Sequence, residues 1–225
     1  GPLKGTCARA PHGETCDWAV YNFVPHASDS KVVRQALEAA GDSEDKFMIR
    51  TMAQLHSLNL AGRDTAPLSR FEDWRAHMAY LGELAAESGS SDAVAAVQAV
   101  RTSLEIHAVP DLPPALCHYD FHFGNALCGA DGSLQAMIDW EFAGIADPRL
   151  DVARCCRRRR WEGDIVCRDR GSDAETLEMW AAYAAARFGP SADPLVVLGP
   201  LEPWLALENL VVLATCAAVC GRLAR

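Results

Sequence analysis

The segment from residue 126 to residue 138 constrains the fold more than any other part of the sequence. Two short apolar runs, 126–128 and 134–138, flank Gly-Ala-Asp-Gly-Ser at 129–133, and this turn sequence predicts a short β-hairpin. Such a hairpin brings Asn125, at the start of one strand, and Asp139, at the end of its partner, to the same end. An amide oxygen beside a carboxylate suits Mg²⁺, which prefers hard oxygen ligands and takes only one or two from protein.

Most of the remaining chain has the periodicity of amphipathic helices. Apolar residues recur every three or four positions, which predicts helices that begin near residues 31, 42, 71, 94 and 150 and helices over 175–188 and 203–223. Gly41 should close the first of them in a left-handed conformation. His56 lies beside the second apolar stripe, and we expect a hydrogen-bonded, semi-buried histidine there because no partner ligands are nearby in the sequence.

The N-terminal region has strand character. Residues 3–9 and 18–24 contain β-formers, and the turn sequence at 10–14 between them predicts a hairpin that Pro25 ends. The sequence therefore predicts an α+β, mainly helical fold with a hairpin at the N-terminus.

Composition disfavours some partners and compartments. Twenty-one Lys and Arg against thirty Asp and Glu give a formal charge of −9, which disfavours nucleic acid and mildly favours cationic small molecules. Nine cysteines without a C-x-x-C pair fit neither a disulfide framework nor a zinc ribbon, so we expect reduced thiols in the cytoplasm. The apolar run 204–220 is interrupted by Glu208 and Asn209, which favours a buried helix over a membrane span.

A second motif precedes the hairpin. The protein-kinase catalytic loop reads H-R-D-L-x-x-x-N; its Asp accepts the proton of the attacking hydroxyl, its Asn holds a metal, and a later Asp binds Mg²⁺. Four residues reproduce that order and spacing: His118, Asp120, Asn125 and Asp139. Tyr119 replaces the Arg, and Trp-Glu follows Asp139 in place of Phe-Gly.

These motifs resemble the aminoglycoside phosphotransferase and choline kinase-like family. The resemblance rests on HYDFHFGN at 118–125, IDWE at 138–141 and DPRLDVA at 147–153, with MAQLH at 52–56 similar to the family's Leu-His helix. It implies a protein kinase-like fold with Asp120 as catalytic base and with Asn125 and Asp139 as Mg²⁺ ligands. It also implies a supporting set around the loop, namely His118, His122, Asp147 and Asp151.

The resemblance also assigns the N-terminal region. VYNFVP at 20–25 is similar to the hinge between two lobes, so the Asn22 carbonyl and the Val24 amide would face the edge of the nucleotide base, while His26 stands where the family usually has Gly. We expect residues 1–27 to be a remnant of the N-terminal lobe and 28–225 to be the helical C-terminal lobe. The strands that carry a phosphate-covering loop and its Lys are missing upstream, and Lys4 is expected to be solvated. We therefore favour a longer parent protein over a natural chain that lacks this lobe, and we expect little turnover by this chain alone.

The expected reaction is transfer of the γ-phosphate of ATP or GTP to a hydroxyl of a small molecule. A cationic acceptor such as an aminoglycoside or choline would suit the net charge, and a macrolide, a sugar or another metabolite stays open; antibiotic resistance is one role that the family includes. The resemblance suggests that later helices wall the acceptor pocket, with the candidates Trp161, Trp180, Glu202, Trp204 and Glu208. Arg154 and the arginines at 157–160 are expected to be solvated or to pair with carboxylates.

Two other classes stay open. A metal-dependent hydrolase is suggested by a group of ligand-type residues, Cys117, His118, Asp120, His122 and Cys128, although it leaves Asp139 and Asp147 unexplained. The other class is a non-catalytic binding module derived from a degenerate kinase lobe, against which the intact Asp120, Asn125 and Asp139 argue.

Overall fold

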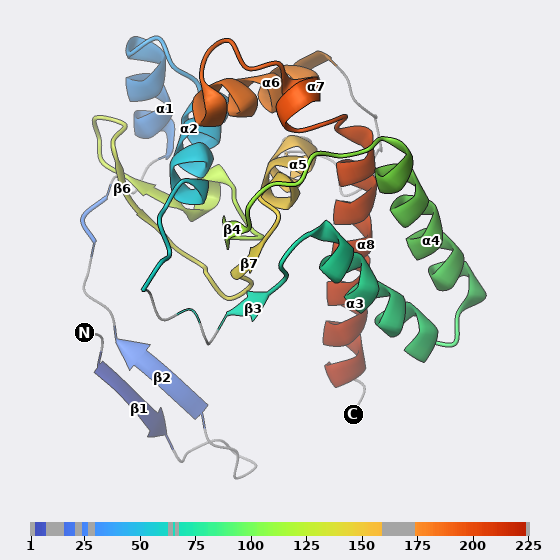
Figure 1. Cartoon of the computed structure of the whole chain (residues 1–225). Coiled ribbons are helices and arrows are strands. Elements are labelled where there is room, and N and C mark those ends of the chain that lie inside the picture. The colour runs from blue at the N-terminus through green and yellow to red at the C-terminus, as the bar shows by residue number, and fades with distance from the viewer. Residues whose placement is uncertain are drawn as a thin grey trace.

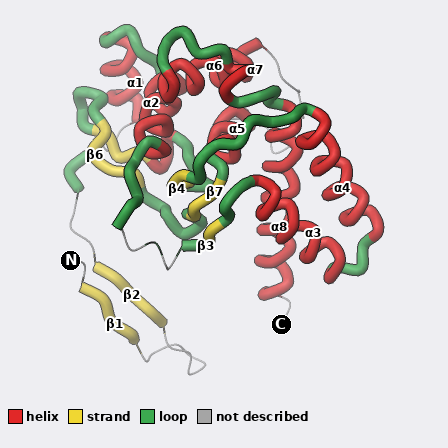
Figure 2. The backbone as a smooth tube through the Cα atoms, in the orientation of Figure 1, coloured by secondary structure: helices red, strands yellow, loops and turns green. Residues whose placement is uncertain are grey.

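The computed structural model describes residues 3–7, 16–20, 24–26, 30–62, 65, 68–158 and 174–223. Its strands are short and most of the described residues lie in helices, so the prediction of a mainly helical α+β chain is confirmed; Figure 2 shows the helices in red. At the N-terminus β1 (Leu3–Cys7) pairs antiparallel with β2 (Cys16–Val20), which confirms the predicted hairpin.

The helices follow the apolar periodicity closely. They are α1 (Ser30–Ala39), α2 (Glu44–His56), α3 (Trp74–Glu87), α4 (Ser91–Ile106), α5 (Arg149–Arg158), α6 (Ala174–Phe188), α7 (Pro194–Val197) and α8 (Glu202–Leu223). Gly41 has φ +74°, as predicted for the residue that closes α1. The Ser43 side chain accepts a hydrogen bond from the backbone N–H of Lys46 and caps α2, because the first N–H groups of a helix have no partner within it.

The stripe that starts at Phe71 becomes helical only at Trp74. Asp73 caps α3 by accepting from the backbone N–H of Ala76 at 2.8 Å. The backbone N–H of Phe71 is used elsewhere, since it donates to the carbonyl of Ile145 at 2.8 Å. The apolar periodicity therefore begins about one turn before the helix does. It begins at Phe71, whose backbone continues the strand Ser69–Arg70.

That strand belongs to a three-stranded sheet that the sequence did not predict. Its order is β3 (Ser69–Arg70), β7 (Gly144–Ala146) and β4 (Ala115–Cys117); β7 is parallel to β3 and antiparallel to β4. Strands of two or three residues are too short to display an alternating pattern. The central strand β7 is buried throughout, whereas Arg70 of β3 is exposed, and Figure 1 shows β3 at the edge of the helical body.

The predicted hairpin at 126–138 is present. β5 (Ala126–Cys128) pairs antiparallel with β6 (Leu134–Met137), and Ala126 lies opposite Met137. Gly132 has φ +81°, and a Cβ at this position would lie 3.2 Å from Leu37 Cδ2. Glycine is required there both by the left-handed backbone and by the close approach of α1.

The core joins these elements around α5. Helix α2 packs on α6, α3 on α4, and α8 on α3, α4 and α5, while α5 also contacts α2 and α6. Large buried side chains at the centre of the core include Met52, Met78, Leu104, Trp180, Tyr183 and Trp204. Within the described residues no helix combines the length and apolarity needed to cross a membrane.

Candidate functional site

The loop between β4 and β5 carries the first predicted residues. Asp120 is 8% exposed, and Asn125, at the end of a short 3₁₀ turn, is 6% exposed. The Asn125 side-chain amide donates to the Asp120 backbone carbonyl at 2.9 Å and lies 3.2 Å from Asp120 Oδ2. These two residues, five apart in the sequence, are thus in direct contact.

The hairpin brings the other predicted residue to this loop. The backbone N–H of Ile138 donates to the Asn125 carbonyl at 2.9 Å, so the chain just before Asp139 is bonded to Asn125 itself. Asp139 is exposed and has φ +66°, a left-handed conformation that is uncommon for a residue other than glycine. Such conformations concentrate at functional sites, where the surrounding structure imposes them.

His118 connects the loop to the end of β6. It is 0% exposed, its Nδ1 accepts from the backbone N–H of Asp120 at 3.3 Å, and its Nε2 therefore carries the proton that it donates to the Ile138 carbonyl at 2.8 Å. One ring thus contacts both the residue after Tyr119 and the residue before Asp139. It supports the loop from within the protein and offers no surface to solvent.

Asp151, on α5, holds the backbone of the loop. Its Oδ2 accepts from the N–H of His118 and its Oδ1 from the N–H of Tyr119, both at 2.7 Å. Tyr119 has φ +59°, so the carboxylate bonds the loop where its backbone is in a strained conformation. His56 lies on the other side of Asp151, with its Nε2 3.2 Å from Oδ2 and its Nδ1 2.8 Å from the Tyr183 hydroxyl.

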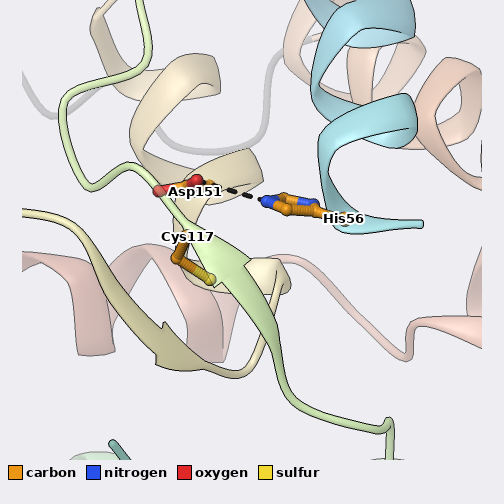
Figure 3. Close-up of side chains that lie close together, drawn as sticks. All are labelled: His56, Cys117 and Asp151. Atoms are coloured by element: carbon orange, nitrogen blue, oxygen red, sulfur yellow. Dashed lines mark hydrogen bonds and ion pairs between the residues drawn. The ribbon is translucent and has the colours of Figure 1, made fainter. Parts of the chain in front are cut away.

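His56 is 3% exposed and hydrogen-bonded through both ring nitrogens, as expected from the sequence. Figure 3 shows it beside Cys117 and Asp151, and among the described residues these three form the one group of His, Cys and acidic side chains close enough to hold a metal. Their ligand atoms are already engaged. Burial raises the pKa of the Cys117 thiol well above its usual range, and a metal would need the thiolate.

The hydrolase alternative loses its support here. His118 is fully buried with both ring nitrogens bonded, and the described residues contain no converging group formed by His118, Asp120 and His122. His122 is exposed by 36% at its side chain, and its Nε2 lies 3.5 Å from Asp120 Oδ2. It therefore lies beside the carboxylate but does not complete a set of metal ligands.

Asp147 is bonded to Arg149 and not to the loop. Arg149 is 0% exposed; its Nε and one terminal nitrogen reach the Asp147 carboxylate at 2.8 and 2.6 Å. Its other terminal nitrogen donates to the Leu198 carbonyl at 3.0 Å, and its guanidinium lies 4.0 Å from the centroid of the Trp204 ring. Trp204 is completely buried in this packing, so its ring presents no surface to an acceptor.

The other predicted pocket residues are dispersed. Trp180 is buried and donates to the Gly199 carbonyl at 3.0 Å, whereas Glu202 is exposed in the first turn of α8. Glu208 is 3% exposed and lies 3.3 Å from Arg154. Trp161 and the side chains at 157–160 lie outside the described residues.

The predicted hinge is described only in part. Asn22 lies outside the described residues, and Val24 is half-buried, with its carbonyl bonded to the His26 ring at 2.9 Å. Contact between the Val24 amide and a nucleotide base stays a prediction.

The donor set fits a magnesium ion. Within the described residues, both side-chain contacts of Asn125 use its amide nitrogen, which leaves Oδ1 to turn toward a cation. The Asp139 carboxylate is exposed at the same end of the hairpin. Mg²⁺ commonly takes one or two hard oxygen ligands from protein, and phosphate and water complete its coordination shell.

Comparison with known proteins identifies the family of the chain. The model of the phosphotransferase enzyme family (APH) matches residues 5–188. A search of curated proteins gives no significant match.

Two solved structures share the fold. A candidate aminoglycoside phosphotransferase from Ralstonia eutropha is 14% identical with a TM-score of 0.57; the match covers 95% of this chain and 66% of that one. An ethanolamine kinase from Plasmodium vivax is 13% identical with a TM-score of 0.52, over 92% of this chain and 58% of that one. The chain thus spans less than two thirds of the length of either protein.

Proposed function

Since this chain belongs to the phosphotransferase enzyme family, we propose that it moves the γ-phosphate of ATP or GTP to a hydroxyl group of a small molecule. Membership of this family was predicted from the motifs at 118–125, 138–141 and 147–153, and that prediction is confirmed. The nucleotide, the metal and the role of each side chain are part of the proposal. So is the assignment of residues 1–27 and 28–225 to two lobes.

One observation carries the proposal. Asn125 contacts the Asp120 carboxylate through its side chain and the residue before Asp139 through its backbone. Asp120, Asn125 and the chain that leads into Asp139 thus lie in one small region. Phosphoryl transfer to a hydroxyl uses these three groups, a base and two metal ligands.

Each side chain then has a specific task. Asp120 accepts the proton of the acceptor hydroxyl as its oxygen attacks the terminal phosphorus. The Asn125 amide N–H orients the Asp120 carboxylate. Asn125 Oδ1 and the Asp139 carboxylate would hold Mg²⁺, which, when bound, neutralises charge on the phosphate oxygens.

The surrounding residues keep the base in place before substrate arrives. Asp151 bonds two consecutive backbone N–H groups of the loop, and His118 connects the loop to the Ile138 carbonyl. Catalysis of phosphoryl transfer depends mainly on positioning and electrostatic stabilisation, so a rigid loop contributes directly to the rate.

The experiment is an acceptor screen with Mg²⁺ and γ-labelled ATP or GTP, on this chain and on the longest natural protein that contains it. Asp120→Asn should lower the transfer rate by about 10²-fold or more, because a general base commonly contributes at least that much. Asp92→Asn, an exposed carboxamide substitution in the first turn of α4, is the matched control and should leave the rate unchanged.

Removal of Mg²⁺ with EDTA should abolish transfer, and added Mg²⁺ should restore it. Turnover in Asp120→Asn close to that of the unaltered protein would contradict the assignment of the base. Nucleotide binding without transfer to any acceptor by the natural protein would favour the non-catalytic binding module.

A further inference from the structure

Arg154 lies beside the proposed base. Its guanidinium, which extends from α5, is 3.4 Å from Asp120 Oδ1 and 3.3 Å from Glu208 Oε1 on the adjoining helix α8. The other carboxylate oxygen of Asp120 faces Asn125 and His122. Arg154 therefore borders the base on the oxygen that does not face the proposed metal ligand.

The contacts of Arg154 differ from those of an arginine with a structural role. Arg149, five residues earlier on the same helix, is fully buried, with contacts of 2.6 and 2.8 Å to Asp147 and a further bond to a backbone carbonyl. Both ion pairs of Arg154 are longer, and its Nε is buried without a hydrogen-bond partner in the described part of the chain. Arg154 is therefore held by its partners less tightly than Arg149, and its partly exposed side chain can turn toward a ligand.

The three charged side chains of this cluster differ in exposure. The side chain of Arg154 is 18% exposed, that of Asp120 is 11% exposed and that of Glu208 is 4% exposed. Glu208 is thus the least accessible of the three and is paired with the guanidinium. A molecule beside Asp120 can therefore contact the guanidinium of Arg154, whereas the carboxylate of Glu208 is almost inaccessible.

We propose that Arg154 is an acceptor-binding specificity residue that favours a hydroxyl acceptor carrying a carboxylate or another anionic group close to the reacting hydroxyl. The inference rests on the proposed function, because it takes Asp120 as the base. A guanidinium is suited to carboxylate and phosphate oxygens, which its planar array of donors matches in geometry.

This preference is opposite to the one that net charge predicts. The formal charge of −9 acts over long distances and is screened over about 8 Å at physiological ionic strength. At the distance of a bound acceptor the placement of individual charges matters more than their sum, and Arg154 is the most exposed of the three charged side chains on this side of Asp120.

A matched set of three alcohols tests the proposal: 3-hydroxypropionate, 1,3-propanediol and 3-amino-1-propanol, which differ mainly in the charge at one end. Binding is measured by ligand-observed NMR titration in the presence of Mg²⁺ and a non-hydrolysable ATP analogue. The anion should bind about tenfold more tightly than the diol, and the cation should bind most weakly.

Four variants locate the effect. Arg154→Gln should abolish the preference and Arg154→Lys should keep part of it. Because Arg154→Gln leaves the buried Glu208 without its arginine, the double variant Arg154→Gln/Glu208→Gln repeats the test with both charges removed. Arg75→Gln, at an exposed arginine paired with Asp111, removes the same charge elsewhere and should leave the preference intact.

Equal binding of the three alcohols by the unaltered protein, or an anion preference that survives in the double variant, would overturn the proposal. The γ-phosphate transfer assay is a separate measurement. An arginine-dependent preference for the anion without transfer would count against the proposed function and in favour of the acceptor subsite. Transfer without any charge preference would support the function and refute the subsite.

Discussion

His77 provides a prediction whose magnitude follows directly from the structure. It lies in α3, is 4% exposed and stacks on Phe71 with ring centroids 4.1 Å apart, and its Nδ1 has no hydrogen-bond partner in the described part of the chain. The ring of Tyr119, in the loop between β4 and β5, meets the His77 ring edge-on, with ring centroids 6.4 Å apart. Burial lowers the pKa of His77 from an ordinary value of 6.5 to about 4.

This lowered pKa makes stability depend on pH in a defined direction. Above pH 6.5 His77 is neutral in both the folded and the unfolded chain, so it contributes no pH dependence. As the pH falls below 6.5 the unfolded chain binds a proton that the folded protein does not, and the free energy of unfolding decreases until about pH 4. At roughly 1.36 kcal/mol for each pH unit, the complete loss is about 3.4 kcal/mol, of which about 2 kcal/mol is reached at pH 5.

The test is the variant His77→Phe, which keeps an aromatic ring against Phe71 but cannot titrate. Urea unfolding, followed by tryptophan fluorescence between pH 7.5 and pH 4.5, gives the free energy of unfolding of both proteins at each pH. The difference between the two curves isolates His77, because other titrating groups contribute equally to both. His107→Gln, which replaces an exposed histidine at the end of α4, is the control variant.

Between pH 7.5 and pH 5 the unaltered protein should lose about 2 kcal/mol more than His77→Phe. Parallel stability curves across this range would refute the argument, because they would mean that His77 takes up its proton equally easily in the folded and unfolded states.

Two further predictions concern the backbone of the site. Asp151→Asn should destabilise the protein by about 2–4 kcal/mol, because one loop N–H loses its acceptor in a buried position. Hydrogen exchange should then show faster exchange of the Tyr119 amide. Unchanged protection of that amide would contradict the role of Asp151. Gly132→Ala should cost about 1–2 kcal/mol, because it combines a left-handed backbone with a 3.2 Å contact to Leu37. Gly62→Ala has φ +73° but no neighbour within 4 Å, so it measures the backbone effect alone in the same urea titration, and equal losses in the two variants would remove the contact with Leu37 from the argument.

The sequence predicted the elements whose signals are local. The stripes from residue 31 to residue 104 gave helices because each apolar face packs in the core, and the turn at 129–133 gave the hairpin. The predicted hairpin also implied which residues lie at its open end. Because Ala126 pairs with Met137, Asn125 and Ile138 lie side by side there. Contact between Asn125 and Asp120 follows from a spacing of five residues in a tight loop.

Contacts between distant parts of the chain were not predictable in the same way. Asp151 is 95 residues from His56 in the sequence and Arg154 is 34 residues from Asp120, and no local pattern records either contact. The Leu-His pair at 55–56 marked His56 as part of a motif but did not identify its partner. Arg154 pairs with carboxylates, as one of the two expectations for the arginines had it, but the sequence did not identify Asp120 and Glu208 as its partners.

The spacing of Asp151 and Arg154 on α5 has an evolutionary consequence. The two residues are three positions apart, so they lie on neighbouring parts of one helix face, and one bonds the loop backbone while the other faces its carboxylate. Position 151 therefore holds the loop, and position 154 is the one proposed to select the acceptor, on the same helix. With the proposed role of Arg154, acceptor preference can change by substitution at position 154 while Asp151 keeps the loop intact, which would allow related proteins to acquire new substrates through few mutations.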